Sequence, residues 1–491
     1  MAGSKTLWGV IAAVVVIVLG VVAWMATQPP AGAPTTTSPA QTTSPSPTSP
    51  AQTPTAAQTP QTPPPATPTA TPPPATTPPP TTTPPHAGKC PDEIVIGTPM
   101  PISGRYAAEA QYSLWGVLAV VNWINDKGGV DCGGKKVKVK LLYRDSESKL
   151  ELAQSLTESL ITRDKVHFLL SPYGSDLALG VSPIAEKYGV LMAVVGAASD
   201  RIFRQGFKYV VGVAAVASQY MVPVLDMAVK TDPTIKRVAI LYRDSEFNIM
   251  VAEGAKKHAE KLGLQVVVYE KYPASPQDLT PQILKVKQAS PDIIIVASHF
   301  ADGQLAVRQL AEQKVDAKLV ALSVAPLVPD FYKALQTKAE CIVGPSHWEP
   351  DVNYTPELAK QRGVEWFGPT KEEFIQYFKS VAKQMGGQEV DPGYHAAWGA
   401  EGALAILYGV QKAGTVETDK VLEALRNARF LTFFGEFKLD PATNLNAAHS
   451  MVVIQWQGGN RHVVWPAGVA EGKLAYPSLT WDQKEAGQTC K

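Results

Sequence analysis

The feature that most constrains the fold of this chain is a regular alternation of short apolar runs with amphipathic segments, which starts at residue 92. Runs such as 92–100 are short and rich in β-branched residues, as buried strands are. The segment 112–127 instead repeats its apolar residues at helical spacing and ends at a Gly-Gly pair. Strands that alternate with helices predict parallel sheets covered by helices on both faces.

The alternation occurs twice, and each series predicts one sheet. The predicted strands are 92–100, 136–146, 167–172 and 190–196 in the first series, and 236–244, 265–272, 292–298, 318–323 and 339–346 in the second. The predicted helices between them are 112–127, 151–164 and 175–189, then 248–263, 279–290, 302–314 and 325–336. Two such series, too long together for one hydrophobic core, predict an α/β protein with two lobes.

A third stretch follows, with predicted helices at 371–386, 394–414 and 418–428 and a predicted β-hairpin at 449–466 that turns at a Gly-Gly pair. Two α/β lobes with shared helices predict a cleft between them. Ligands of open α/β sheets lie beyond the carboxyl ends of the strands, and hinge motion closes such a cleft around a ligand.

The N-terminal part of the chain has a different character. No Asp, Glu, Lys or Arg occurs between Lys5 and Lys89, and residues 7–26 form an uninterrupted apolar run. Twenty apolar residues are long enough to span a bilayer, so this run predicts that residues 1–27 form a single-pass anchor. The rest of the chain would then lie on the extracytoplasmic side of the cell membrane. The alternative is a cleaved signal peptide.

Residues 28–88 consist almost entirely of Pro, Thr, Ala, Ser and Gln, and 21 of the 42 prolines lie between positions 29 and 85. This composition cannot bury a core and predicts an extended stalk. Pro with Thr and Ser is also typical of O-glycosylated spacers, and the two interpretations are compatible.

The charge balance and the motifs exclude several functions. The 403 residues after Gly88 carry 44 basic and 44 acidic side chains, which disfavours nucleic-acid binding. The sequence contains no HExxH, CxxC, GxSxG or GxxxxGK[ST] motif. We therefore expect no metal, no cofactor and no enzymatic activity.

The four cysteines favour two disulfides. Cys90 precedes the first predicted strand and Cys132 the second, so a Cys90–Cys132 bond would join neighbouring strands. Cys341 would then pair with Cys490. Four cysteines allow three pairings, and free thiols are the remaining alternative.

Four segments together resemble a known family. Residues 96–129, 169–199, 237–263 and 292–313 are similar, in this order, to type I periplasmic binding proteins, in particular the leucine/isoleucine/valine-binding branch that serves ABC importers. The resemblance implies two Rossmann-like lobes joined by three crossover segments near residues 213, 345 and 447. The implied domains are 89–213 with 346–447 for lobe 1, and 214–345 with 448–491 for lobe 2.

The resemblance also implies a ligand-carboxylate site. Ser175 matches the family's serine at the start of the helix after the third strand, where free N–H groups favour an anion. The other interpretation is that Ser175 is an ordinary N-cap of this helix, and the two interpretations are compatible. The family's next contact corresponds to Gly196 and Ala198, with Ser199 as a substitute hydroxyl.

The chain departs from the family at other ligand positions. The family's second-lobe tyrosines correspond to Phe247 and to His299, or to Phe300 after a slip of one residue. The acid that neutralises a ligand ammonium corresponds to Ser323. Glu109 would replace that acid, unless it is a solvated loop residue. The other candidates share a position at the expected cleft rim: Arg105, Tyr106, Tyr173, Trp348 and Tyr394.

These features predict an extracytoplasmic receptor of an ABC importer. It would capture a small polar ligand, such as a branched-chain or related amino acid or an amide-like compound, and deliver it to a permease driven by an ATPase. The alternatives are a ligand sensor that signals to a membrane partner and, less favoured, an enzyme.

Overall fold

The computed structural model describes residues 90–387 and 389–491. The predicted anchor at 1–27 and the predicted stalk at 28–88 lie outside the described residues. Within the described part of the chain, no helix combines the length and the apolar character needed to cross a membrane.

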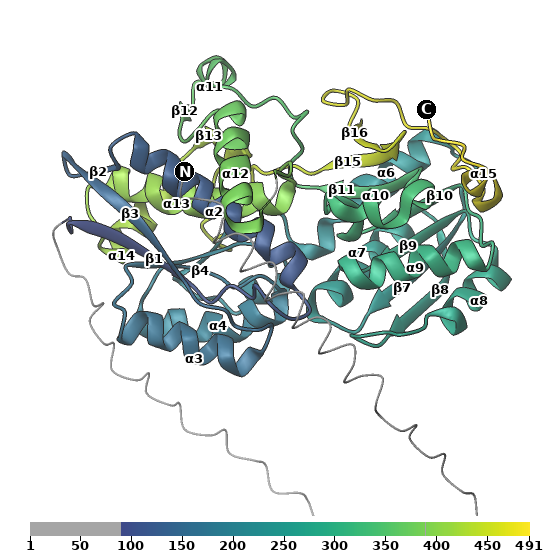
Figure 1. The fold of residues 1–491 in the computed structure, drawn as a ribbon, viewed down its shortest axis with the longest axis horizontal. Helices are drawn as coiled ribbons and strands as arrows, with labels where there is room; N and C mark the ends of the chain where they lie inside the picture. The colour runs from purple at the N-terminus through teal and green to yellow at the C-terminus, as the bar shows by residue number, and fades with distance from the viewer. Residues whose placement is uncertain (1–89, 388) are drawn as a thin grey trace, which may run out of the picture. The chain divides into compact units, whose positions relative to one another are not determined.

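The first series of strands forms a six-stranded sheet in the order β2-β3-β1-β4-β5-β6 (Figure 1). Its strands are β1 (Glu93–Thr98), β2 (Val130–Cys132), β3 (Lys135–Tyr143), β4 (Phe168–Leu170), β5 (Met192–Val194) and β6 (Val210–Gly212). All neighbours are parallel except β2, which pairs antiparallel to β3. Strands β4 to β6 are fully buried, which explains their continuous apolar sequences.

Helices cover both faces of this sheet. They are α2 (Ala107–Asp126), α3 (Leu150–Thr162), α4 (Ser175–Tyr188), α5 (Asp200–Arg204), α12 (Lys371–Gly386), α13 (Tyr394–Ala413) and α14 (Thr418–Arg426). In Figure 1, α3 and α4 lie on one face, and α2 and α13 lie on the other. We call this sheet with its helices the first lobe.

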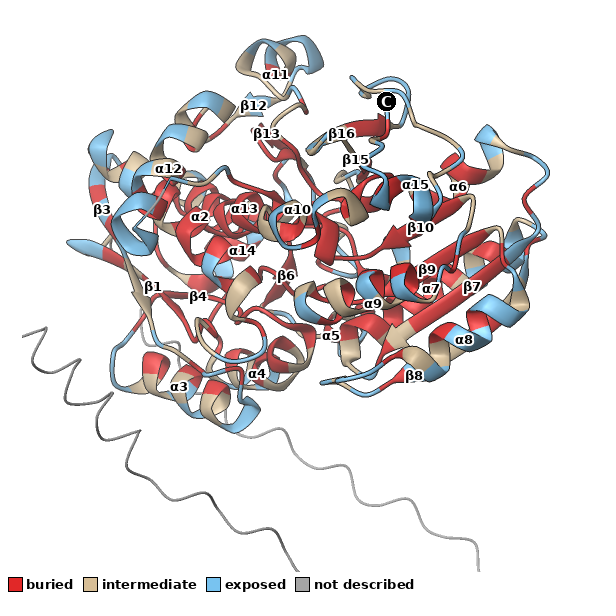
Figure 2. Cartoon of the chain, turned by 45° about the vertical axis from the view of Figure 1, so that its right-hand side comes forward, coloured by how far each residue is buried: buried red, intermediate tan, exposed pale blue. Residues whose placement is uncertain are grey.

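Helix α13 packs closely against α2. A Cβ atom added at Gly116 would lie only 1.9 Å from the carbonyl oxygen of Ala396, so glycine is required for this approach. Helix α13 is buried over almost its whole length, and Figure 2 shows the buried residues concentrated in this helix, in α2 and in the strands. A helix that is apolar on all sides belongs inside a protein, as observed here.

The second series forms a seven-stranded sheet in the order β16-β15-β11-β10-β9-β7-β8. Its strands are β7 (Arg237–Arg243), β8 (Gln265–Tyr272), β9 (Ile293–Ala297), β10 (Leu319–Leu322), β11 (Ile342–Ser346), β15 (Val452–Gln457) and β16 (Asn460–Trp465). Its helices are α6 (Val222–Thr231), α7 (Glu246–Lys261), α8 (Thr280–Ala289), α9 (Phe300–Glu312), α10 (Asp330–Leu335) and α15 (Trp481–Glu485). We call this sheet with its helices the second lobe.

The predicted hairpin is confirmed as β15 and β16, which turn at Gly458 and Gly459 and extend the sheet antiparallel to β11. The segment predicted as one helix at 325–336 is instead divided between the 3₁₀ turn Ala325–Leu327 and α10. Pro329 lies between the two and cannot donate the hydrogen bond that a continuous helix needs.

A small third sheet escaped prediction. It contains β12 (Glu365–Trp366), β13 (Phe430–Thr432) and β14 (Gly435–Phe437), and α11 (Pro356–Arg362) precedes it. Strands of two or three residues are too short to show the period of two by which strands are recognised.

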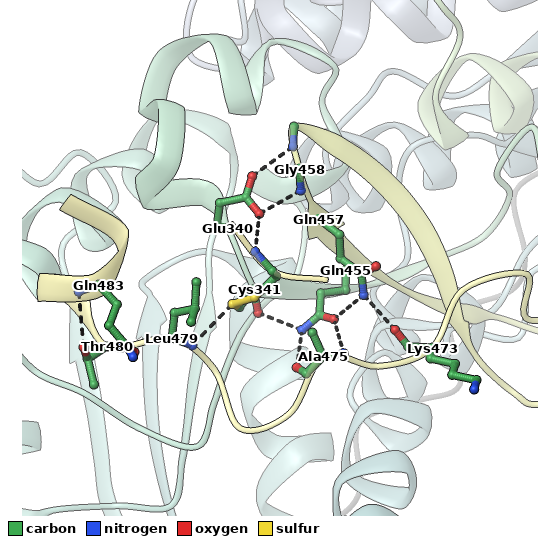
Figure 3. Close-up of a disulfide and its surroundings, with 12 residues drawn as sticks. Glu340, Cys341, Gln455, Gln457, Gly458, Lys473, Ala475, Leu479, Thr480 and Gln483 are labelled. Atoms are coloured by element: carbon green, nitrogen blue, oxygen red, sulfur yellow. Dashed lines mark hydrogen bonds between the residues drawn. A yellow bond between two sulfur atoms is a disulfide. The ribbon is translucent and has the colours of Figure 1, made fainter. Parts of the chain in front are cut away.

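Both predicted disulfides are confirmed, Cys90–Cys132 and Cys341–Cys490. The second one holds the C-terminal segment against the second lobe (Figure 3). Next to it, the Glu340 carboxylate accepts hydrogen bonds from the N–H groups of Gly458, Gly459 and Cys490. The C-terminus is therefore fastened covalently and by a network of hydrogen bonds.

Candidate functional site

A small cavity lies where the carboxyl ends of strands from the two sheets face each other. In each sheet the first strand lies between two later strands, β1 between β3 and β4, and β7 between β8 and β9. This reversal of strand order leaves a crevice that open α/β sheets use for ligands. The cavity is lined by Tyr173, Ser175, Gly196, Ala198, Tyr220, Phe247, His299, Val324, Tyr394 and Trp398.

The cavity is small. Its volume of about 10 Å³ is room for about one water molecule. A larger solute therefore does not fit in this arrangement of the side chains.

Ser175 forms the floor of the cavity on the side of the first lobe. Its Oγ accepts hydrogen bonds from the N–H groups of Ala198 and Ser199, both at 3.0 Å. The N-cap of α4 is Gly174, so the interpretation of Ser175 as an ordinary N-cap is wrong. With two hydrogen bonds accepted, the Ser175 hydroxyl retains its proton for donation to an acceptor in the cavity.

The helix that starts at Ser175 adds further donors. The first intrahelical bond of α4 runs from the N–H of Ala178 to the carbonyl oxygen of Gly174, at 2.9 Å. The N–H groups that precede Ala178 in the helix have no intrahelical acceptor, and the positive end of the helix dipole lies with them. This side of the cavity is suited to an anionic group.

Glycines allow the aromatic residues to pack against the floor. Gly196 has a φ of +61°, and a Cβ atom there would lie 2.2 Å from the ring of Tyr173. Any other residue at this position would strain the backbone and displace the ring.

The walls of the cavity are aromatic and uncharged. Ring centroids are 5.0 Å apart for Tyr220 and Phe247, 5.4 Å for Phe247 and His299, and 6.4 Å for His299 and Tyr173. Burial, together with the positive charge of Arg243, holds the pKa of His299 well below its ordinary value. His299 is therefore neutral at pH 7.

Tyr220 is held by a chain of two histidines. Its Oη lies 2.8 Å from Nε2 of His347, and Nδ1 of His347 lies 3.0 Å from Nε2 of His449. Burial lowers the pKa of both histidines, that of His449 to about 3. The chain therefore consists of neutral groups and fixes the Tyr220 ring in the cavity wall.

A second unused donor belongs to Trp398, which lines the cavity. Its Nε1 is buried, and no atom of the described residues accepts its proton. An unsatisfied buried donor costs roughly 1–3 kcal/mol, which a bound acceptor would recover.

Acidic residues link the lobes and do not line the cavity. Glu109 on α2 accepts a hydrogen bond from the N–H of Phe300 on α9, at 3.0 Å. Burial raises the pKa of Glu109 to about 7. Glu246 on α7 forms a second link, since it accepts from Ser199 Oγ at 2.6 Å and pairs with Arg201 at 2.8 Å. Of the described residues that line the cavity, none is Asp or Glu.

The structure brings together half of the fourteen candidates that the sequence analysis named. Those that line the cavity are Tyr173, Ser175, Gly196, Ala198, Phe247, His299 and Tyr394. Two of the remaining seven, Glu109 and Phe300, join the lobes through the hydrogen bond described above.

The last five candidates lie beside the cavity or away from it. Arg105 lines a separate pocket. Tyr106 lies next to His299, with ring centroids 5.2 Å apart, and Ser199 caps α5. Ser323 exchanges hydrogen bonds with the backbone of Ser298. Trp348 is fully buried and donates to the carbonyl oxygen of Phe433.

The residues that sequence reasoning missed are Tyr220, Val324 and Trp398. Trp398 lies one helical turn after Tyr394, so helical spacing from that candidate would have found it. Tyr220 lies directly after a 3₁₀ turn and Val324 directly before one, and neither belongs to a periodic pattern.

Comparisons with known proteins agree on the architecture. The family model described as "Periplasmic binding protein" matches residues 93–460. The chain is 25% identical to the Leu/Ile/Val-binding protein homolog 7 of Brucella suis over 397 residues, which cover 78% of this chain and 94% of the relative.

Two solved structures have a similar fold. The substrate-binding protein LivJ from Streptococcus pneumoniae in complex with isoleucine gives a TM-score of 0.62 at 19% identity, with 79% of this chain and 99% of that chain covered. An ABC transporter solute-binding protein from R. palustris in complex with 4-hydroxybenzoate gives 0.63 at 22% identity, with 75% and 95% covered.

Proposed function

Because the chain belongs to the periplasmic binding protein family, we propose that it is the solute-binding receptor of an ABC importer and that it encloses a small carboxylate-bearing solute between its lobes. The single observation that carries this proposal is the small cavity at the strand ends of both sheets. Its floor presents unused hydrogen-bond donors, and its walls are aromatic and uncharged.

We assign the solute's carboxylate to the floor of the cavity. The Ser175 hydroxyl and the N-terminus of α4 favour an anion there, and the Trp398 indole adds a neutral donor. The rings of Phe247 and Tyr220 would then enclose the apolar body of the solute.

Two classes of carboxylate-bearing solute come into question for the cavity, amino acids and acids without an ammonium group. The relatives include Leu/Ile/Val-binding homologs and a protein bound to 4-hydroxybenzoate, thus amino acids and an aromatic acid. An α-amino acid also brings an ammonium group, which is costly to bury without an acid. Glu109 is the acid nearest to this role, but its burial raises its pKa to about 7 and one of its oxygens already accepts from Phe300. These contacts favour a carboxylate without an ammonium group.

Capture would proceed by hinge motion. We place the hinge at the three crossover segments near residues 213, 345 and 447, which divide the chain into lobes at 89–213 with 346–447 and 214–345 with 448–491. Links between the lobes, such as Glu109 to Phe300 and Ser199 to Glu246, are present in this arrangement and would break on opening.

We place the receptor outside the cell membrane, tethered by residues 7–26 and held away from it by the stalk at 28–88. Such a tether raises the concentration of the receptor near the ABC permease and ATPase that it would supply.

Calorimetric titration of the full-length chain tests the proposed solute. Leucine, isoleucine, benzoate and 4-hydroxybenzoate would be compared with the amides leucinamide and 4-hydroxybenzamide. We expect at least one carboxylate to bind, and its amide to bind at least tenfold more weakly. Equal affinity for an acid and its amide, or no binding by any acid, would contradict the proposal.

A further inference from the structure

We propose that the closed cleft holds a second anion subsite, formed by Arg105 of the first lobe and Arg243 of the second, which receives a carboxylate beyond the aromatic cavity. This inference rests on the proposed function and narrows its ligand class to solutes with an anionic group at each end, or to a monocarboxylate bound together with a free anion.

A separate pocket marks the subsite. Its volume is about 210 Å³, and both arginines line it. The ring of Tyr106 lies at the boundary between this pocket and the aromatic cavity. Its centroid is 5.2 Å from that of His299, which lines the cavity, and 5.8 Å from Cζ of Arg243, which lines the pocket.

Of the two arginines, Arg243 gives the stronger evidence for an anion-binding subsite. It is the last residue of β7, at the strand end where ligands bind in such sheets, and only 3% of its surface is exposed. Its Nη1 lies 3.3 Å from Asp302, and its Nε has no hydrogen-bond partner among the described residues. A guanidinium has five N–H donors, so a buried one that makes so few hydrogen bonds is suited to an added acceptor.

Closure brings Arg105 to the same pocket from the other lobe. Its Cζ lies 4.9 Å from the Tyr106 ring centroid, so two guanidinium groups approach one ring, each from its own lobe. An anion between the two guanidinium groups would be attracted to both.

Two acids pair with the arginines, Asp302 in the lining of the pocket and Asp176 outside that lining, and both accept further hydrogen bonds. Asp176 pairs with Arg105 and accepts from Tyr106 Oη at 2.8 Å. Asp302 accepts from Tyr272 Oη at 2.7 Å and from the N–H of His299 at 3.2 Å.

Each arginine thus has one acid in its own lobe, which orients it before closure. Glu109, the third acid of this region, accepts from the N–H of Phe300. Besides the two arginines, the polar residues Ser275, Gln277 and Asp302 line the pocket. Carboxylate is the group that matches a guanidinium geometrically.

The test is calorimetric titration of the full-length chain with matched acids. The probes are the linear dicarboxylates from succinate to suberate and terephthalate, each compared with the monocarboxylate of the same length, from butyrate to octanoate and benzoate. We expect at least one dicarboxylate to bind tenfold or more tightly than its partner. A parallel series repeats the monocarboxylates in millimolar acetate, so that a free anion is distinguished from a second carboxylate of the solute.

Two variants assign the effect to the arginines. We call the higher affinity of a dicarboxylate over its monocarboxylate the dicarboxylate advantage, and the higher affinity of a monocarboxylate in acetate the acetate enhancement. In Arg243→Gln either effect should disappear, while the affinity for the monocarboxylate alone stays within about twofold. Arg105→Gln, at a side chain with 39% of its surface exposed, tests the subsite without a buried change. Arg144→Gln is the matched control, since this arginine is 43% exposed and forms its ion pair with Asp164, away from the pocket.

The outcomes separate the two proposals. If monocarboxylates bind but neither a dicarboxylate advantage nor an acetate enhancement exists, or if either persists in both pocket variants, the subsite is refuted and the proposed function stands. If no acid binds the wild-type chain, the proposed function fails and the subsite fails with it.

Discussion

Replacing Ser175 by alanine tests the floor of the cavity. The Ser175 hydroxyl accepts from two buried N–H groups, those of Ala198 and Ser199, each at 3.0 Å. Leaving both without a partner lowers the free energy of unfolding by roughly 2–6 kcal/mol, at about 1–3 kcal/mol each. The lost hydrogen bond to a carboxylate is worth roughly 1.5–3 kcal/mol, which corresponds to an affinity about 10- to 150-fold lower.

A second serine of the first lobe provides the control. Ser171 exchanges hydrogen bonds with the backbone of Val195, both at 3.0 Å, and is equally buried, but it does not line the cavity. Urea unfolding should show both alanine variants to be less stable, while calorimetry should show an affinity loss only for Ser175→Ala. Unchanged affinity of Ser175→Ala, or an equal loss in both variants, would refute the assignment of the carboxylate to this floor.

Three further changes test the fold and its electrostatics. Burial raises the pKa of Glu401 from 4.5 to about 8, so its contribution to the free energy of unfolding is complete below pH 4.5 and is lost as pH rises to 8, at roughly 1.4 kcal/mol per pH unit. In Glu401→Gln the thermal stability should fall less steeply between pH 6 and 8. An unchanged slope would contradict the effect of burial on Glu401. Gly116→Ala places a Cβ 1.9 Å from the Ala396 oxygen and should lower the free energy of unfolding by about 1–3 kcal/mol or more, which urea unfolding would show as a lower midpoint. A wild-type midpoint would refute the close packing of α2 on α13. Replacing Cys341 and Cys490 by serine should lower the free energy of unfolding by about 2–5 kcal/mol relative to the oxidised wild-type chain. A difference in unfolding free energy that persists when both proteins are reduced would show that the lost disulfide is not its cause.

Local sequence pattern predicted the elements that build the site. The alternation of strands and helices placed Ser175 at the start of a helix and Gly196 after a strand, and both line the cavity. Both disulfides were predicted, because neighbouring strands bring Cys90 near Cys132 and leave Cys341 for Cys490.

Side-chain direction could not be predicted in the same way. Trp348 lies in the segment after β11, but its indole turns into the core and donates to Phe433. Ser323 and Ser199 use their hydroxyl groups for hydrogen bonds with Ser298 and with Glu246. Such choices depend on which residues of distant segments meet, and the local sequence carries no information about that.

The most direct test of a solute receptor is to identify what it carries. The full-length chain, purified without added ligand and then denatured, would release its bound molecule for mass spectrometry, with Ser175→Ala processed in parallel. We expect a small carboxylate in near-stoichiometric amount from the wild-type chain and much less from the variant. A released molecule without a carboxyl group, or equal amounts from both proteins, would contradict the binding of a carboxylate at Ser175.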